Sequence, residues 1–378
     1  MTETALVGAR IFAGETWYDG HALVLSHGRI EMLLRAQDVP DNMAVQTLDG
    51  GVLLPGFVDT QVNGGGGVLF NDAPTVDGII SIAEAHRKFG TTAMLPTLIS
   101  DDLDVIAKAI GAVDDAIRAG VPGIVGIHIE GPFLNPRKHG IHDAGKFRAL
   151  DADTIALLLS LKNGRTLVTL APELAPEGAI AALVKGGAIV AAGHTLATYD
   201  DMRRAIGEGL SGVTHLFNAM TQMESRAPGV VGASMDSGLI CGIIADGHHV
   251  HPASLRAAYR AKGRKELMLV TDAMPPVGSD ITSFTVGETA VTAREGMLRS
   301  DDGTLAGSDL DMTSALRNCV ALMQVDLGSA SQMASATPAD FIGIGNAYGR
   351  ISEGYRADLV HLDDALNIQN VWIAGDLA

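Results

Sequence analysis

The sequence predicts an α/β protein whose main body is a (β/α)8 barrel. Apolar strand-like segments alternate with amphipathic helical segments along most of the chain, the pattern of repeated βα units and a parallel sheet. Eight strand candidates can be counted, and polar residues able to do chemistry recur where these strands end. The alternation also fits an open, doubly wound sheet. The polar strand ends favour the barrel, because its active sites lie at the C-terminal ends of the strands.

The expected strands are short apolar runs bounded by turn residues or by helical patterns. They cover residues 53–62, 91–97, 123–130, 165–172, 188–195, 212–218, 239–247 and 266–273. Helical spacing of apolar residues fills the gaps, as in VDGIISIAEAHRKF (76–89) and LDVIAKAIGAVDDAIRAG (103–120). Residues 1–50 instead show short alternating runs separated by Gly and Asp, which predict hairpins, and residues 350–378 have the same character.

Composition excludes several classes of protein. A chain of 378 residues with 47% hydrophobic composition can bury a large core. Its 44 acidic and 27 basic residues give a net charge of −17, which argues against general attraction to nucleic acid or anionic membranes. Any anionic ligand must therefore be bound by local cations.

The cysteines and the apolar runs bear on the compartment. The two cysteines, Cys241 and Cys319, lie in apolar surroundings and fit core packing in a reducing compartment. The N-terminus lacks a signal-peptide pattern, and no apolar run approaches the roughly 20 residues of a membrane-spanning helix. We expect a soluble, cytoplasmic protein.

The stretch GIHIEGPF places a carboxylate at the end of an apolar strand. Ile127 and Ile129 share one face, which leaves His128 and Glu130 on the other. A buried carboxylate needs a cation, a metal ion or hydrogen-bond donors. The other strand ends supply polar partners that would converge on a barrel: Asp59, Gln61, Asn63, His194, His215 and Asp272.

Three of these residues suit a metal ion. Two neutral imidazoles (His194 and His215) and one carboxylate (Glu130) fit a divalent ion such as Zn²⁺ with a fourth position open to water. A single strand histidine is more often a hydrogen-bonded core group, but the convergence of three ligands favours the metal. His128 is expected to orient the layer beneath the site. Four further histidines are expected to be solvated: His21, His27, His86 and His361.

Asp272, in LVTDAM, follows an apolar strand. One interpretation is a cap for the next element. We favour a general base that takes a proton from a metal-activated water and returns it to the leaving group.

Seven motifs carry a family resemblance: LPGFVDTQVNG (54–64), HIEGPFLNPRKHGIH (128–142), AAGHT (191–195), THLFNAM (214–220), ADGHHV (245–250), VTDA (270–273) and GTLAGS (303–308). Together with the closing stretch NAYGRISEGYRADLVHLD (346–363), the chain from about residue 50 onward resembles the N-acetylglucosamine-6-phosphate deacetylase family of the amidohydrolase superfamily. HIEGPF and THLFNAM are specific to this branch.

The resemblance implies a TIM-like (β/α)8 barrel over residues 51–345 and a small β-sandwich domain formed from the N- and C-terminal segments, 1–50 and 346–378. The implied reaction is hydrolysis of the N-acetyl group of N-acetylglucosamine 6-phosphate to glucosamine 6-phosphate and acetate. Carried over by motif, the metal ligands are Glu130, His194 and His215, and the catalytic carboxylate is Asp272.

The resemblance also implies the substrate contacts. Arg226 and His249 match phosphate ligands, with the arginine contributed by a neighbouring subunit of a homodimer or larger homo-oligomer. The remaining contacts are Ile141, His142, Asn218 and Ala219, and a loop over the sugar formed by Leu305, Ala306 and Gly307. Many superfamily members hold a second metal with His-x-His after the first strand. Here Gln61 and Asn63 stand at those positions, so one divalent metal per subunit is expected.

Local chemistry agrees with a phosphate, since arginine offers it a bidentate fork. Arg226 alone would otherwise be a solvated loop charge. Residues 137–139 (RKH) are expected to form a mobile loop over the site. The glycine run 64–67 lacks the Lys-Ser/Thr ending of a P-loop and is expected to let the backbone pass close to the site.

Three alternatives stay open at this stage. The substrate could be N-acetylgalactosamine 6-phosphate, because the sequence does not fix the sugar epimer, or it could be an N-acyl amino acid. The third alternative is a non-catalytic assembly protein that kept the barrel, which the intact ligand set and Asp272 argue against.

Overall fold

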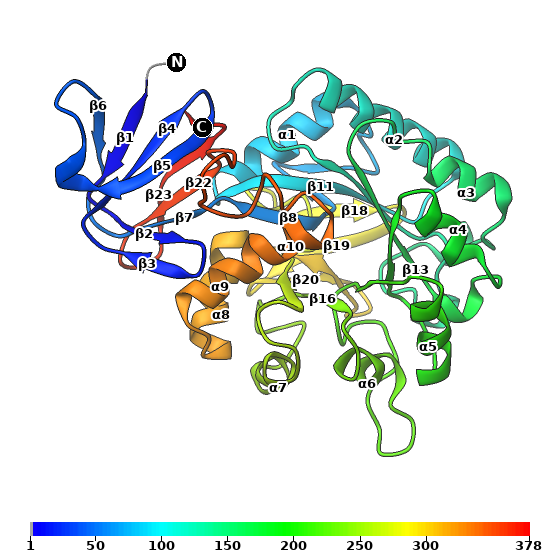
Figure 1. The fold of residues 1–378 in the computed structure, drawn as a ribbon. Coiled ribbons are helices and arrows are strands. Elements are labelled where there is room, and N and C mark those ends of the chain that lie inside the picture. Colours follow the sequence, from blue (N-terminus) through cyan, green and yellow to red (C-terminus); the bar gives the residue numbers. More distant parts are fainter. Residues whose placement is uncertain (1–2) are drawn as a thin grey trace.

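The computed structural model describes residues 3–378, and its centre is an eight-stranded parallel sheet in the order β17-β16-β15-β14-β13-β12-β11-β8 (Figure 1). The sheet closes on itself, because Val62 bridges Ala273 in parallel and Asp272 N donates to Gln61 O at 2.9 Å. The predicted (β/α)8 barrel is confirmed. Its strands are β8 (Phe57–Val62), β11 (Thr91–Ile99), β12 (Gly126–Glu130), β13 (Arg165–Leu170), β14 (Ile189–Ala192), β15 (Gly212–Val213), β16 (Ile240–Ile243) and β17 (Leu267–Leu269).

Helices surround the barrel, and the longer ones bury one apolar face against it. In α2, Ile106, Ile110 and Val113 recur at helical spacing and are all buried. The helix α1 starts where the Thr75 side chain accepts a hydrogen bond from Gly78 N at 3.2 Å. The helices are α1 (Val76–Arg87), α2 (Leu103–Arg118), α3 (Ala152–Leu158), α4 (Ala179–Lys185), α5 (Tyr199–Gly207), α6 (Gly229–Met235), α7 (Pro252–Lys262), α8 (Met312–Met323), α9 (Leu327–Ala334) and α10 (Ala336–Phe341).

A small β-sandwich stands beside the barrel, and Figure 1 shows N-terminal (blue) and C-terminal (red) strands side by side in it. One sheet has the order β5-β4-β1-β6 and the other β24-β23-β22-β7-β2-β3. Leu23, Leu53 and Trp372 from both ends of the chain share one buried cluster, so the predicted sandwich is confirmed. Its strands are β1 (Thr4–Val7), β2 (Arg10–Ala13), β3 (Thr16–Tyr18), β4 (His21–Ser26), β5 (Arg29–Arg35), β6 (Ala44–Thr47), β7 (Val52–Pro55), β22 (Leu359–Leu362), β23 (Ile368–Ile373) and β24 (Asp376–Leu377).

The run expected to form the first barrel strand, 53–62, is divided between the two parts of the molecule. Its first half is β7, which pairs with β22 in the sandwich, and its second half is β8 of the barrel. The chain changes sheets at Gly56, where a Cβ atom would lie 2.1 Å from Thr92 Oγ1. Glycine therefore permits the close approach at this crossing.

A four-stranded antiparallel sheet after the last barrel strand was not predicted. It comprises β18 (Ser283–Val286), β19 (Thr289–Arg294), β20 (Met297–Ser300) and β21 (Leu305–Ser308). Val286, Val291 and Leu298 form its apolar cluster with Met274. The predicted loop at 305–307 is thus a strand, β21. Its sheet reaches the barrel where Met274 N donates to Ser308 O at 3.0 Å.

Two of the histidines expected in solvent are buried, so that prediction was wrong for them. His86 Nε2 donates to Gly64 O at 2.9 Å. The ring packs against Gly65, where a Cβ atom would lie only 2.8 Å from Nε2. His361 donates to Gly50 O at 2.9 Å.

Both cysteines are buried, as expected. Within residues 3–378, no helix is long and apolar enough to span a membrane.

Candidate active site

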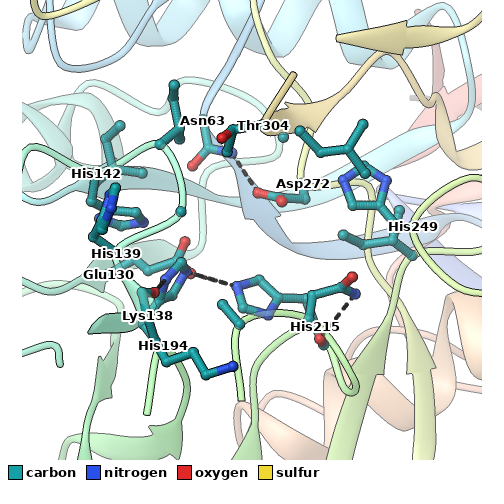
Figure 2. Close-up of a pocket in the computed structure, with 18 of the residues that line it drawn as sticks. Asn63, Glu130, Lys138, His139, His142, His194, His215, His249, Asp272 and Thr304 are labelled. Atoms are coloured by element: carbon teal, nitrogen blue, oxygen red, sulfur yellow. Dashed lines mark hydrogen bonds and ion pairs between the residues drawn. The ribbon is translucent and has the colours of Figure 1, made fainter. Parts of the chain in front are cut away.

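A pocket of about 390 Å³ opens at the C-terminal ends of the barrel strands (Figure 2). Glu130 ends β12, His194 and His215 follow β14 and β15, and Asp272 follows β17. Strands far apart in sequence therefore bring all four side chains into one pocket, as the sequence predicted for a barrel.

Glu130, His194 and His215 converge on one point, and each is buried. Their candidate ligand atoms all lie within 4.8 Å of one another. His215 Nε2 is 3.0 Å from Glu130 Oε1 and 3.0 Å from His194 Nε2. His194 Nε2 is 3.2 Å from the same carboxylate oxygen.

This cluster has the donor chemistry that a divalent metal requires. His194 Nδ1 donates to Lys138 O at 2.7 Å, and its Nε2 faces the other two groups. Burial opposes ionisation of Glu130, but its close contacts with the imidazoles of His194 and His215 hold its pKa well below the usual range. An ionised carboxylate beside two imidazoles fits a divalent ion.

Asp272 faces the cluster and is held by two amides. Its Oδ1 accepts from Asn63 Nδ2 at 2.7 Å (Figure 2) and from Gln61 Nε2 at 3.1 Å. Gln61 Nε2 also donates to Glu130 Oε2 at 3.0 Å. Burial, with the nearby charge of Glu130, raises the pKa of Asp272 to about 6. Gln61 and Asn63 thus serve as donors to the carboxylates.

His142 also lines the pocket, with its ring centroid 4.4 Å from that of His194. Its Nδ1 accepts from Ser100 N at 3.3 Å and lies 2.8 Å from Ser100 Oγ. Burial and the neighbouring His194 keep its pKa well below the usual range. The ring is therefore neutral with its proton on Nε2, where it can donate a hydrogen bond to a ligand.

His128 lies below the pocket, in the position the strand pattern predicted. Its Nε2 is 2.8 Å from Thr169 Oγ1, and its Nδ1 is 3.3 Å from Thr97 Oγ1. Burial lowers its pKa to about 4, so the ring is a neutral part of the core.

Three of the chemically important residues have left-handed backbone conformations. The φ angles are 48° at His194, 33° at His215 and 53° at Asp272. Such angles are unusual for residues other than glycine and cluster at functional sites. They turn the chain sharply at the end of each strand.

The predicted substrate contacts are not all in the pocket. Arg226 is exposed on the loop between β15 and α6 and does not line it, and Ala306 is fully buried behind it in the cluster of the β18–β21 sheet. The others do line it: Ile141, His142, Asn218, Ala219, His249, Leu305 and Gly307. His249 is held by Asp246, with Nδ1 2.6 Å from Oδ2.

Several residues that line the pocket, or that hold a side chain lining it, were missed. Ser100 directly follows β11, and the strand-end pattern that identified Glu130 would have found it. Thr304, directly before β21 of the unpredicted sheet, lines the pocket. Residues 137–139, expected in a loop over the site, line the pocket from a short 3-10 helix (Pro136–Lys138) and the residue after it.

A buried carboxylate–imidazole cluster facing a second carboxylate, at the C-terminal end of a (β/α)8 barrel, places the chain in the class of metal-dependent hydrolases. The model of the Amidohydrolase family matches residues 52–378, and that of the NagA composite domain matches residues 4–53. The chain belongs to the amidohydrolase family, and the resemblance found in its motifs is confirmed.

Curated relatives and solved structures agree with this assignment. An N-acetylgalactosamine-6-phosphate deacetylase of Shewanella sp. (strain ANA-3) is 50% identical over 332 residues, covering 87% of this chain and 84% of the relative. The human N-acetylglucosamine-6-phosphate deacetylase is 37% identical over 347 residues, covering 87% and 83%. The crystal structure of N-acetylglucosamine-6-phosphate deacetylase from Pasteurella multocida superposes with a TM-score of 0.97 at 34% identity, covering 100% of this chain and 99% of that one.

Proposed function

We propose that this chain is an amide-bond hydrolase that removes the acetyl group of N-acetylglucosamine 6-phosphate, giving glucosamine 6-phosphate and acetate. The observation that carries the proposal is the convergence of Glu130, His194 and His215 opposite Asp272 in one pocket. The names of its relatives and of its structural neighbours support the same reaction.

Glu130, His194 and His215 are the proposed holders of one divalent ion per chain. Zn²⁺ suits the two nitrogen donors and one oxygen donor better than Mg²⁺ or Ca²⁺, which prefer oxygen. When bound there, the ion would lower the pKa of a water molecule and polarise the amide carbonyl. The amide donors of Gln61 and Asn63 already serve Asp272 and are poor metal ligands, which favours a single ion.

Asp272 is the proposed general base and acid. It takes a proton from the attacking water and delivers it to the amine that leaves. Asn63 and Gln61 hold the accepting carboxylate in place. The Nε2–H of His142 is available to donate to the carbonyl oxygen as negative charge develops there.

The remaining predicted contacts are proposed to bind the sugar and its phosphate. Asn218 and Ala219 line the pocket on one side, while Leu305 and Gly307 line it from β21, with Ala306 between them facing the core. The backbone at Ile141 stands beside His142. His249, held by Asp246, is the proposed phosphate ligand within the chain.

Arg226 is proposed to reach the phosphate of a neighbouring subunit, so the functional unit would be at least a homodimer. Its exposed position outside the pocket of its own chain supports this arrangement. The two buried thiols suit a reducing compartment, and we propose the cytoplasm as the place of the reaction.

N-acetylgalactosamine 6-phosphate is the second candidate substrate, because the relative at 50% identity is a deacetylase of that epimer. Acetate release from both epimers, measured with and without a chelator, tests the proposal. We expect chelator-sensitive release from the glucosamine epimer. Faster turnover of the galacto epimer would favour the second candidate, and no release from either would favour a non-catalytic protein.

A further inference from the structure

A carboxylate outside the pocket joins the two segments that position the metal ligand His194. Glu173 lies in a short 3-10 helix (Pro172–Leu174) after β13, is partly buried and does not line the pocket. In the part of the chain that the structure describes, it forms no ion pair with a cation. Its oxygens instead accept hydrogen bonds from Asn135 Nδ2 at 2.9 Å, from Leu196 N at 2.6 Å and from Thr195 Oγ1.

One connection of Glu173, through Thr195 and Leu196, anchors the backbone next to the ligand His194. Thr195 and Leu196 directly follow His194, and both donate to the Glu173 carboxylate. The Thr195 hydroxyl also accepts from Ala197 N at 2.9 Å. Besides the bond from Thr195 N to Ala219 O at 3.0 Å, the segment after β14 is therefore fixed by the Glu173 side chain to the end of the neighbouring strand β13.

The other connection of Glu173, through the Asn135 side chain, leads to the imidazole ring of His194. Asn135 N donates to His194 O at 2.9 Å, and Asn135 O accepts from Lys138 N at 2.8 Å. Asn135 Oδ1 accepts from Arg137 N at 3.0 Å, so the amide that Glu173 holds also shapes the next turn. That turn presents Lys138 O to His194 Nδ1 at 2.7 Å.

Both the backbone that follows His194 and the turn that presents a carbonyl to its ring are thus connected to one carboxylate. We propose that Glu173 is a positioning residue for the metal site, which fixes His194 with Nε2 toward Glu130 and His215. This inference rests on the proposed function in one respect, namely that the cluster holds a divalent ion. Partners behind a metal ligand usually contribute about 10- to 100-fold to metal affinity.

The test is Glu173→Gln in the full-length protein. The amide keeps the shape, but its NH₂ group replaces an acceptor with a donor and weakens the three-donor arrangement. We expect Zn²⁺ affinity, measured by competition with a chelator, to fall about 10- to 100-fold. The absorption spectrum of the Co²⁺-loaded protein should also change, because it reports ligand geometry. The matched control is Glu177→Gln, an exposed residue for which no side-chain contact is seen, and it should leave both measurements unchanged.

Asn135→Ala separates positioning from general stability, because it removes the link to the ring and leaves the link to Leu196. It should also weaken Zn²⁺ binding, and in both variants Zn²⁺ should raise the melting temperature less than it does in the wild type. The inference would be overturned if both variants kept the wild-type affinity for Zn²⁺ and lost the same melting temperature with and without Zn²⁺. That result would leave the proposed function standing. If the wild-type chain itself holds no Zn²⁺, the proposed function fails first.

Discussion

The two ends of the pocket differ in how completely one chain builds them. At the metal end, Glu130, His194, His215 and Asp272 are all buried and hydrogen-bonded within the chain. At the end proposed for the phosphate, His249 lines the pocket but Arg226 lies exposed outside it. The comparison teaches that the fold of one chain completes the buried carboxylate–imidazole cluster, whereas the arginine proposed to bind the phosphate lies on an exposed loop, within reach of a second chain.

The largest effect should follow from breaking the metal end. His215→Ala removes one of three ligands, and we expect it to abolish both metal retention and acetate release, because the ion supplies the activated water. Elemental analysis should find about one metal per wild-type chain and almost none in the variant. The control is His27→Ala, at an exposed histidine of the sandwich. Two tight, catalytically required metals in the wild type would contradict the single-ion site.

The second-largest effect should follow from removing the proposed general base, Asp272, while the metal ion stays bound. Asp272→Asn should retain fold and metal but lower kcat by about 10²- to 10⁴-fold, the usual contribution of a general acid–base group. The amide preserves the shape and loses the basicity. Steady-state kinetics with a parallel metal assay would check this, and a variant within a few-fold of the wild type would assign the proton transfer to another group.

The phosphate end should show a smaller and more selective effect. Arg226→Ala should raise KM about 30- to 150-fold, which corresponds to about 2–3 kcal/mol for a charge-assisted bidentate contact. Turnover of unphosphorylated N-acetylglucosamine should barely change. Arg35→Ala, at an exposed arginine of the sandwich, is the control. An equal loss on both substrates would indicate a folding defect instead of phosphate recognition.

A mixture of chains sharpens the comparison between the ends. When Asp272→Asn and Arg226→Ala chains exchange subunits, a contact across the interface gives each mixed dimer one site with both defects and one intact site. Activity at low substrate should then rise above that of either parent. If exchange is proven and activity does not recover, Arg226 acts within its own chain or not at all.

The smallest effect on catalysis is expected from the sandwich. Leu23→Ala, at a fully buried position of the sandwich cluster, should lower the free energy of unfolding by about 2–5 kcal/mol. Because the pocket draws no residue from that cluster, kcat and KM below the unfolding transition should stay near wild-type values. Chemical denaturation and the acetate assay would test this together. A large change in kcat would show that the sandwich shapes the active site.

Much of the barrel was predictable because its signals are local. Each strand is a short apolar run, and the residue that lines the pocket stands at or after its end, as for Glu130 and Asp272. The β18–β21 sheet was missed because its strands are short, polar and half exposed, so their pattern is weak. The division of 53–62 between two sheets depends on the contact of Gly56 with Thr92, which no local pattern records.

The burial of polar residues was harder to predict, since it depends on partners distant in sequence. His86 and His361 can be buried because the backbone carbonyls of Gly64 and Gly50 accept hydrogen bonds from their Nε2 atoms. Glu173 shows the same limit: its partners Asn135 and Leu196 follow two other strands. Such contacts arise only once the barrel brings the strand ends together.

The left-handed backbone angles at His194, His215 and Asp272 bear on the history of this sequence. A residue other than glycine costs about 1–2 kcal/mol in that conformation, so glycine would relax the strain at any of the three positions. The same exchange would remove a side chain that is buried and held by hydrogen bonds in the pocket. At these three positions the pocket therefore keeps a polar side chain at the cost of a backbone conformation that glycine adopts more easily.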